Sequence, residues 1–349
     1  MNTLQSNGSV PRCTNGLEKS DRASLVLVTG ANGFVGSHLT EALLARGYRV
    51  RCMVRRTSDL TFIRHLPVEW AYADVCDAEG LGQACQGVDA VCHCAALTRA
   101  VDQQTFLRVN AQGTEALARA AVQTNPALKR FLFVSSQAAA GPSGGADDCV
   151  DESRPPQPIT WYGVSKWAAE QALLNMDDRL PLTIIRPSPV FGPRDRDFFA
   201  YFDLVKHGLQ LELGRHERRV SLVYVRDLVE LICLALDSEA AVGQTYFGCG
   251  QPHSYAELSQ AITRALNKRT LRIILPVAVL TFIGLGARLQ ERLTGRPALL
   301  NEQRILDMRQ PYWLCSGEKA RRELGFSVRV DLEPAVQETA TWYLENGWL

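Results

Sequence analysis

The segment "LVTGANGFVGSHL", residues 27–39, places three glycines at intervals of three directly after an apolar run. Gly30, Gly33 and Gly36 stand where that run gives way to the amphipathic pattern of a helix. A glycine-rich turn that follows a strand and opens a helix is typical of a site for the diphosphate of a dinucleotide. The alternative interpretation is a glycine-rich turn that holds no ligand.

Each glycine has its own expected role at such a site. Gly30 allows the tight turn, Gly33 lets a diphosphate approach the backbone, and Gly36 lets the helix pack closely on the strand. The helix N-terminus offers free N–H groups and a partial positive charge to the phosphates. The expected cofactor contacts of this loop are Gly30, Asn32, Gly33, Phe34, Val35 and Gly36.

Outward from this loop, the first half of the chain alternates short apolar runs with amphipathic stretches. Helices are expected at 34–47, 102–125 and 160–176, and strands at 25–30, 48–55, 68–75, 89–96, 129–136 and 180–187. Strands that alternate with helices predict a doubly wound parallel sheet of the α/β class, covered on both faces.

The alternation becomes less regular after residue 190. We expect a flexible leader over 1–23, a nucleotide-binding domain over 24–190, and a smaller C-terminal region over 191–349 that mainly binds substrate. A strand near 244–250 is expected to return to the first sheet. No flexible linker separates the halves, so the second region should pack on the first.

Composition narrows the function classes. The 349 residues are 46% hydrophobic and 21% charged, with a net charge of +1. Without a basic field, a nucleic-acid partner is not expected. The ten cysteines are scattered, which favours a reducing cytoplasm over a disulfide framework. Cys92-His93-Cys94 is the nearest approach to a metal pattern, but no second ligand pair follows it, so no metal site is predicted.

The most apolar later stretch is "IILPVAVLTFIGLGA", residues 273–287. It contains Pro276 and is shorter than the roughly 20 residues that span a bilayer. Three interpretations stay open: a buried helix, the wall of an apolar pocket, or an interfacial segment in contact with a membrane.

A candidate catalytic pair lies in "TWYGVSKWAAE". Tyr162 and Lys166 are four residues apart on an expected helix, so their side chains share one face. A nearby ammonium favours the phenolate and lowers the pKa of a tyrosine, which could then exchange a proton with a substrate oxygen. Upstream, Ser135 and Ser136 end an expected strand, where a hydroxyl could orient that oxygen.

The second expected strand ends in "VRRTSDL", where NAD-binding proteins usually carry an acidic residue for the ribose 2′-hydroxyl. Arg55 and Arg56 stand there instead, and arginines suit the 2′-phosphate of NADP. NADP is therefore favoured over NAD. In the alternative interpretation, the two arginines are solvated loop residues.

With T-G-x-x-G-x-x-G, Y-x-x-x-K and the serine between them, the chain from about residue 24 resembles the extended short-chain dehydrogenase/reductase superfamily. Further matching pieces are "ADV" at 73–75, "CAAL" at 94–97, "IRPSPVFGPRD" at 185–195 and "LGF" near the end. The resemblance implies a Rossmann-like domain, a smaller substrate domain, and a homodimer formed through a four-helix interface.

The resemblance also implies roles for individual residues. Tyr162 would be the general acid/base, and Lys166 would hold the nicotinamide ribose and tune Tyr162. Ser136, five residues before Gly141, would be the catalytic serine, with Ser135 as the fallback. Near the cofactor would lie Asp74 and Val75 (adenine), Ala95, Ala96 and Leu97 (cofactor cleft), Asn110 (mostly structural), and the segment from Pro187 to Val190 (nicotinamide amide).

Three departures from family patterns bear on the reaction. Gln137 and Ala138 replace the Asp-Glu pair of 4,6-dehydratases, and Ala140 replaces a tyrosine common in sugar-nucleotide epimerases. Val220 stands where many epimerases clamp a diphosphate with arginine, although Arg218 and Arg219 are close enough in sequence to substitute.

The pattern is therefore more similar to the dihydroflavonol reductase and 3β-hydroxysteroid dehydrogenase branch. An apolar pocket would fit that branch, built from the segment 273–287 with Phe198, Phe199 and Phe202; ordinary core is the alternative for these residues. We predict an NAD(P)-dependent oxidoreductase that interconverts a secondary alcohol and a ketone on a lipophilic small molecule. The alternatives are a sugar-nucleotide epimerase and a cofactor-sensing protein without turnover.

Overall fold

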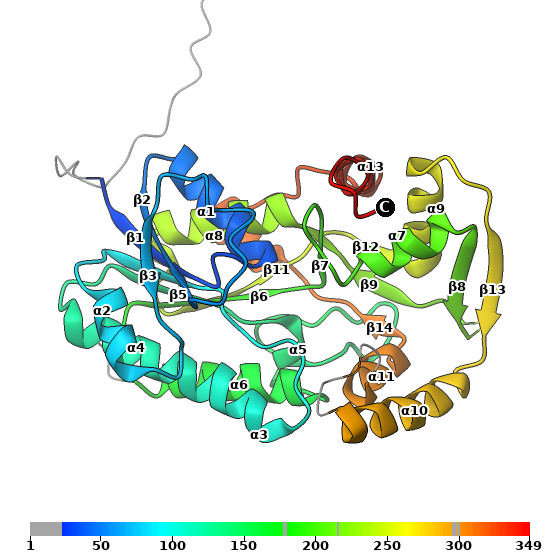
Figure 1. Ribbon diagram of the computed structural model, residues 1–349, viewed down its shortest axis with the longest axis horizontal. Coiled ribbons are helices and arrows are strands. Elements are labelled where there is room, and N and C mark those ends of the chain that lie inside the picture. Colours follow the sequence, from blue (N-terminus) through cyan, green and yellow to red (C-terminus); the bar gives the residue numbers. More distant parts are fainter. Residues whose placement is uncertain (1–22, 177–179, 215, 295–297, 299–300) are drawn as a thin grey trace, which may run out of the picture.

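The computed structural model describes residues 23–176, 180–214, 216–294, 298 and 301–349, so the expected leader lies almost wholly outside the described residues. One sheet dominates the molecule, and its strands are β1 Leu25–Thr29, β2 Arg49–Val54, β3 Glu69–Tyr72, β4 Ala90–His93, β5 Arg130–Val134, β6 Leu182–Pro187 and β11 Gln244–Gly248. They are parallel throughout, in the order β11-β6-β5-β4-β1-β2-β3 (Figure 1). The predicted doubly wound α/β fold is confirmed.

Helices cover both faces of this sheet (Figure 1). One face packs on α1 (Phe34–Ala45) and α8 (Val225–Asp237), the other on α2 (Ala78–Cys85), α4 (Gly113–Thr124) and α6 (Trp161–Leu174). Each face of the sheet has its own hydrophobic core, because successive side chains of β1 point to opposite faces. Val26 and Val28 belong to the core under α1 and α8, and Leu25 and Leu27 belong to the other core. Parallel strands buried on both faces carry continuous apolar runs for this reason.

The helix expected at 102–125 is not uniform. It begins as α3 (Gln103–Phe106), passes through a π-helical turn at Leu107–Gln112, and continues as α4. The Asp102 side chain caps its start by accepting a hydrogen bond from the Thr105 backbone N–H. Such π-turns often mark functional positions, and this one contains Asn110.

The C-terminal region is a set of short elements beside the main sheet. Its strands form three small sheets, β10-β7, β12-β9-β14 and β13-β8. The remaining elements are α5 Gln137–Ala140, β7 Val190–Phe191, α7 Phe199–Lys206, β8 Leu209–Leu213, β9 Arg219–Ser221, β10 Val223–Tyr224, a short 3-10 helix Glu239–Ala241, β12 Pro252–Ser254, α9 Tyr255–Ala265, β13 Leu271–Leu275, α10 Val279–Thr294, α11 Glu302–Arg309, β14 Tyr312–Trp313, α12 Glu318–Leu324 and α13 Leu332–Glu345.

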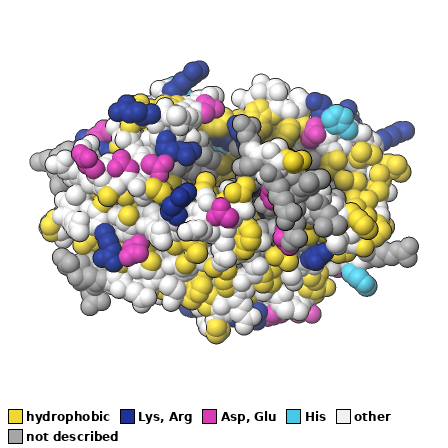
Figure 2. Space-filling view, turned by 60° about the horizontal axis from the view of Figure 1, so that its bottom comes forward, with side chains coloured by type: hydrophobic (Ala, Val, Ile, Leu, Met, Phe, Trp, Pro, Cys, Tyr) yellow, Lys and Arg dark blue, Asp and Glu magenta, His cyan; other side chains and the backbone are white. Residues whose placement is uncertain are grey.

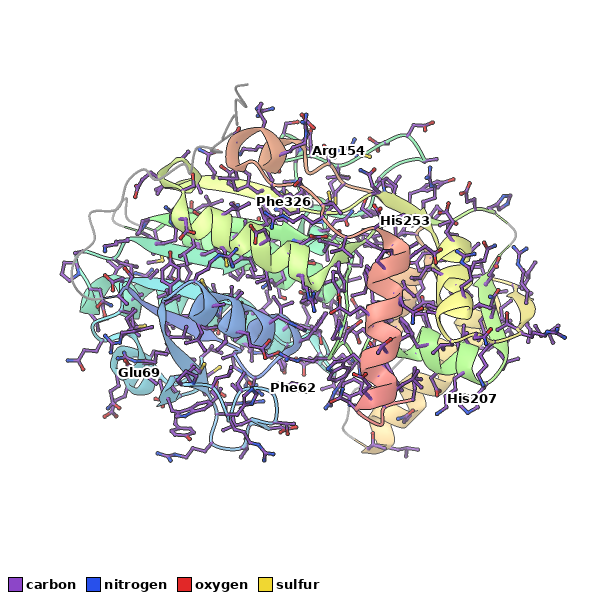
Figure 3. All side chains as sticks on the ribbon, turned by 90° about the horizontal axis from the view of Figure 1, so that it is seen from above. Phe62, Glu69, Arg154, His207, His253 and Phe326 are labelled. Carbon is purple, nitrogen blue, oxygen red and sulfur yellow. The ribbon has the colours of Figure 1, made fainter. Side chains whose placement is uncertain are left out.

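Aromatic contacts fasten α13 to the nucleotide-binding half. Phe62, in the loop after β2, meets Trp342 of α13 edge to face, with ring centroids 6.0 Å apart (Figure 3). Arg194 lies over the Phe62 ring and donates hydrogen bonds to Ser37 and Glu41 of α1. The segment after β6 is thus held against the helix that the glycine loop opens.

Phe198, Phe199 and Phe202 belong to this same aromatic packing. Phe199 and Phe202 pack edge to face on Tyr343, and Phe202 is fully buried. Phe198 stacks near Tyr201 and is also buried. The expectation that these phenylalanines line an apolar pocket is therefore wrong, and ordinary core is the correct interpretation.

The apolar stretch 273–287 does not form a single buried helix. It contains most of strand β13, a turn at Pro276, and the first half of α10. Ile274, Val277 and Phe282 are exposed on the surface, so the buried-helix interpretation is wrong. Within the described residues, no helix combines the length and the apolar character needed to cross a membrane.

Candidate active site

The glycine loop has the geometry of a phosphate cradle. Gly30 adopts φ of +64°, and a Cβ there would lie 2.8 Å from the backbone of Ala95. A Cβ on Gly36 would lie 2.1 Å from the carbonyl oxygen of Gly30, so α1 can approach the turn only because this residue is glycine. Gly33 donates its backbone N–H to Gly30 over 2.9 Å and ends the turn.

Helix α1 starts with free backbone donors. Among the described residues, no side chain caps its N-terminus, and its first turn carries no acidic residue. The N–H groups of Phe34, Val35 and Gly36 therefore have no acceptor within the helix and point toward the loop. This arrangement fits the diphosphate of a dinucleotide, which supplies both negative charge and acceptors.

Most of the residues predicted to contact the cofactor lie at the carboxyl ends of neighbouring strands. Arg55 follows β2, Asp74 and Val75 follow β3, Ala95 and Ala96 follow β4, and Pro187 ends β6, with Val190 just beyond. In open α/β sheets this edge is where ligands bind. Arg55 and Arg56 are both exposed, and the Arg56 guanidinium lies over the Tyr72 ring, 5.2 Å from its centroid.

Asn110 connects the loop after β4 to helix α6. Its side-chain oxygen accepts from the backbone N–H of Leu97 (2.8 Å), and its amide donates to the Leu97 oxygen (2.9 Å) and to Ser165 (3.0 Å). Ser165 in turn donates to the backbone oxygen of Tyr162. Asn110 thus fixes the position of Tyr162 relative to the loop that contains Ala95, Ala96 and Leu97.

The structure brings Ser136 and Tyr162 together. Thr160 caps α6 by accepting from the N–H of Gly163, so Tyr162 sits in the first turn. A Cβ on Gly163 would lie 2.3 Å from the Ala138 oxygen, so this glycine lets α6 approach the segment after Ser136. Burial raises the pKa of Tyr162 to about 12, while its hydrogen bond with the Ser136 side chain acts in the opposite direction.

Lys166 lies one helical turn after Tyr162 and is buried. Its Nζ donates to the Val134 oxygen (2.7 Å) and lies 4.1 Å from the centroid of the Phe133 ring. Burial lowers the pKa of Lys166 to about 7, while the charge of Glu170 raises it. In this structure the pKa of Tyr162 is raised, and the lowering expected from a nearby ammonium is not seen. At neutral pH the Tyr162 hydroxyl keeps its proton.

Ser135 is engaged elsewhere and does not face Tyr162. Its hydroxyl donates to Glu170, which also forms a bidentate ion pair with Arg186 at 2.6 Å and 3.0 Å. The side chains of Glu170 and Arg186 are 1% and 6% exposed. This pair was not predicted from the sequence. The spacing could have indicated Glu170, because it stands four residues after Lys166 and therefore on the same face of the helix.

His93, the middle residue of the Cys92-His93-Cys94 triplet, is buried and makes hydrogen bonds inside the core. Its Nδ1 lies 2.6 Å from Oγ1 of Thr29, and its Nε2 lies 2.8 Å from Oγ1 of Thr114. Because Thr114 donates its own proton to the backbone oxygen of Asn110, it accepts from Nε2, and Thr29 donates to Nδ1. Burial lowers the pKa of His93 to about 3, so the ring is neutral.

Two further polar side chains were not singled out as site residues. Gln137 is 1% exposed, and neither atom of its carboxamide has a partner among the described residues. The hydroxyl of Ser188 is also buried and unpaired there. They follow the adjacent strands β5 and β6, beside Ser136 and Pro187. Buried unpaired polar groups are uncommon and often belong to sites that bind a ligand.

Of the two arginines proposed as substitutes at Val220, Arg218 is held by the backbone and Arg219 is not. Val220 itself is fully buried in β9. Arg218 donates from one terminal nitrogen to the backbone oxygens of Met308 and Gln310, which ties the chain before β9 to the end of α11. Arg219 lies 3.9 Å from Glu217, and its buried Nε has no hydrogen-bond partner among the described residues.

Comparisons with known proteins show the family of the chain. Residues 26–247 match the family model described as the NAD dependent epimerase/dehydratase family. A ceramide reductase of Caulobacter vibrioides is 27% identical, with 95% of this chain and 98% of the relative covered. Sterol demethylase protein B of Methylococcus capsulatus is 30% identical, with 93% and 99% covered.

Sugar epimerases are also similar. The N-acetyl-alpha-D-glucosaminyl-diphospho-ditrans,octacis-undecaprenol 4-epimerase of Escherichia coli O157:H7 is 30% identical, with 80% of this chain and 84% of the relative covered. The crystal structure of UDP-glucose 4-epimerase from Thermus thermophilus in complex with NAD has a TM-score of 0.74 and 24% identity, with 92% and 99% covered. At that identity the likeness supports the fold alone.

Proposed function

The chain belongs to the NAD-dependent epimerase/dehydratase family of oxidoreductase-type enzymes, and we propose that it is a reductase of ketones on lipophilic substrates. The observation that carries the proposal is the contact between Ser136 and a protonated Tyr162 at the carboxyl edge of the sheet, with Lys166 one turn away. A protonated tyrosine is ready to act as the general acid that a reduction requires.

The proposed mechanism assigns each side chain one task. A nicotinamide cofactor, when bound, would supply the hydride for the carbonyl carbon. Tyr162 donates its proton to the substrate oxygen, and Ser136 holds that oxygen by a hydrogen bond. Lys166, one helical turn after Tyr162, would hold the cofactor ribose. In the direction of alcohol oxidation the same tyrosine takes the proton back.

The proposal of a lipophilic substrate is supported by the names of two relatives and by the engagement of Arg218. Two relatives that match nearly the whole chain are named for a ceramide and a sterol. Arg218 is bonded to backbone oxygens and Val220 replaces the usual arginine, so neither position supports the diphosphate clamp of a sugar nucleotide. The predicted phenylalanine pocket does not contribute, because those rings are core.

A sugar-nucleotide epimerase is the second candidate. Its specific support is the Escherichia coli relative, which is as similar in identity as the sterol-named protein although it covers less of the chain. An epimerase would oxidise and re-reduce the same substrate, so it would give no net change in the cofactor. That difference separates the two candidates in one assay.

The assay mixes purified full-length protein with NADPH or NADH and a panel of long-chain and steroid ketones, and follows absorbance of the reduced nicotinamide. We expect steady cofactor oxidation with apolar ketones. Tightly copurified NAD, no net oxidation on any ketone, and conversion of a UDP-sugar would contradict the reductase and support the epimerase.

We also propose NADP as the preferred cofactor, because Arg55 and Arg56 stand exposed after β2 with no acidic residue at that strand end. The double variant Arg55→Gln/Arg56→Gln should raise the Kd for NADPH roughly tenfold or more, since it removes two cations that can pair with the 2′-phosphate. The Kd for NADH should change by less than about twofold.

The matched control is Arg64→Gln, which removes an exposed charge from the same loop. It should leave both Kd values near those of the natural protein. Equal losses of affinity for NADPH and NADH in the double variant would show that the arginines do not bind the 2′-phosphate.

The homodimer implied by the family resemblance stays a prediction.

A further inference from the structure

The small sheet of β8 and β13 has one face made only of aliphatic side chains. The strands pair in parallel, and alternate residues of each strand share a face. The face consists of Leu209, Leu211, Leu213, Leu271, Ile273 and Leu275. No member is buried, and Leu271 is 65% exposed. On the opposite face, Gln210 fastens β8 to α9 by donating to Thr263 over 2.6 Å.

Exposed apolar side chains continue beyond this sheet. Val277 is exposed and lies beside Gly214 at the end of β8, where a Cβ on the glycine would be 3.3 Å from Cγ2 of Val277. Phe282 and Leu293 of α10 are 73% and 78% exposed. Of the eleven exposed large hydrophobic side chains of the described chain, five fall between residues 271 and 293, and one of these, Ile274, lies on the opposite face of the sheet. Figure 2 shows hydrophobic side chains gathered at the right-hand end, where β8 and β13 lie in Figure 1.

Exposed cations lie at one end of this apolar face, where β8 and β13 begin. They are Lys206 at the end of α7, and Lys268 and Arg269 on the chain that enters β13. Arg272 and Glu212 lie on the opposite face of the sheet and pair with each other at 2.6 Å, and α7 adds one carboxylate, Asp203. His207 lies at this same end (Figure 3). The face is therefore apolar with a positive border at one end.

We propose that this surface docks on an anionic phospholipid bilayer. We call it the β8–β13 face and define it as the six aliphatic residues with Val277 and Phe282. An apolar patch bordered by Lys and Arg is the pattern of an interfacial contact, in which aliphatic groups enter the acyl boundary and cations meet lipid phosphates. The positive border selects a membrane of negative charge over a neutral protein surface.

The contact is peripheral, because no described helix can span the bilayer. The proposal does not depend on the reaction, since binding to lipid is measured without substrate or cofactor. If the enzyme acts on a lipophilic substrate, docking would also bring the site to the compartment where such a substrate is dissolved.

The test is cosedimentation of the full-length protein with sucrose-loaded vesicles. We expect binding to vesicles that contain phosphatidylglycerol, with at least about tenfold weaker binding to pure phosphatidylcholine and a loss of binding at high salt. The variant Leu271→Thr/Phe282→Ser should lower binding to anionic vesicles about tenfold or more. Lys268→Gln/Arg269→Gln should weaken binding and reduce its salt dependence.

Leu344→Ser is the matched control, because Leu344 is exposed on α13, away from this face. It should bind vesicles like the natural protein. Circular dichroism and light scattering on every variant separate misfolding from loss of docking. No binding to anionic vesicles, equal binding to neutral ones, or dissociation of a dimer by Leu271→Thr/Phe282→Ser would overturn the proposal, the last by showing that a second copy covers the face.

Discussion

The variant Tyr162→Phe is expected to lose turnover by about 10³-fold, because it removes the proposed general acid while keeping the ring in place. Its hydroxyl hydrogen-bonds with Ser136, and burial raises its pKa to about 12, so at neutral pH it is a proton donor. The Kd for the reduced cofactor should stay within about twofold, since the glycine loop and Lys166 are unchanged. Steady-state assays and fluorescence titration measure the two quantities.

Tyr48→Phe provides the matched control for this change. Tyr48 also loses a hydroxyl that takes part in a hydrogen bond, but its partner is Asp237 at an exposed position away from the strand ends of the site. Its turnover should stay within about twofold of the natural protein. Comparable activity in Tyr162→Phe and the natural protein would remove Tyr162 from the mechanism, whatever the substrate.

The glycine loop shows why much of the fold could be predicted. The roles expected for Gly30 and Gly36 depend on contacts within a few residues or with the adjacent strand, and the structure places backbone atoms where a Cβ would have to be. The strands of the sheet are buried on both faces, so their sequences are continuous apolar runs that stand out locally. Features that depend on residues close in sequence can therefore be predicted before the structure is known.

The missed features depend on long-range packing. Phe198, Phe199 and Phe202 were expected beside a ligand, but they belong to an aromatic core with α13, which lies more than a hundred residues away in sequence. An apolar side chain has the same sequence signal in a core and in a pocket. The stretch 273–287 was ambiguous for the same reason, and only its exposure distinguishes the alternatives.

The second large effect is expected from Glu170→Leu, which should lower the free energy of unfolding by about 3–5 kcal/mol. Glu170 and Arg186 pair in the interior, and Ser135 also donates to the same carboxylate. The substitution leaves the Arg186 charge buried without its partner, which costs more than the pair contributes. It also removes the carboxylate that raises the pKa of Lys166. Urea unfolding followed by circular dichroism measures the loss.

The companion variants decide whether the buried charge is the cause. Glu170→Leu/Arg186→Met should recover most of the loss, because replacing both charges with apolar groups leaves neither unpaired. Glu115→Leu breaks the exposed pair with Arg119 and should cost at most about 1 kcal/mol. If the double variant is as unstable as Glu170→Leu, the loss comes from packing and the hydrogen bond with Ser135. If Glu170→Leu costs no more than Glu115→Leu, the pair does not stabilise the packing of β6 against α6, the helix that carries Tyr162.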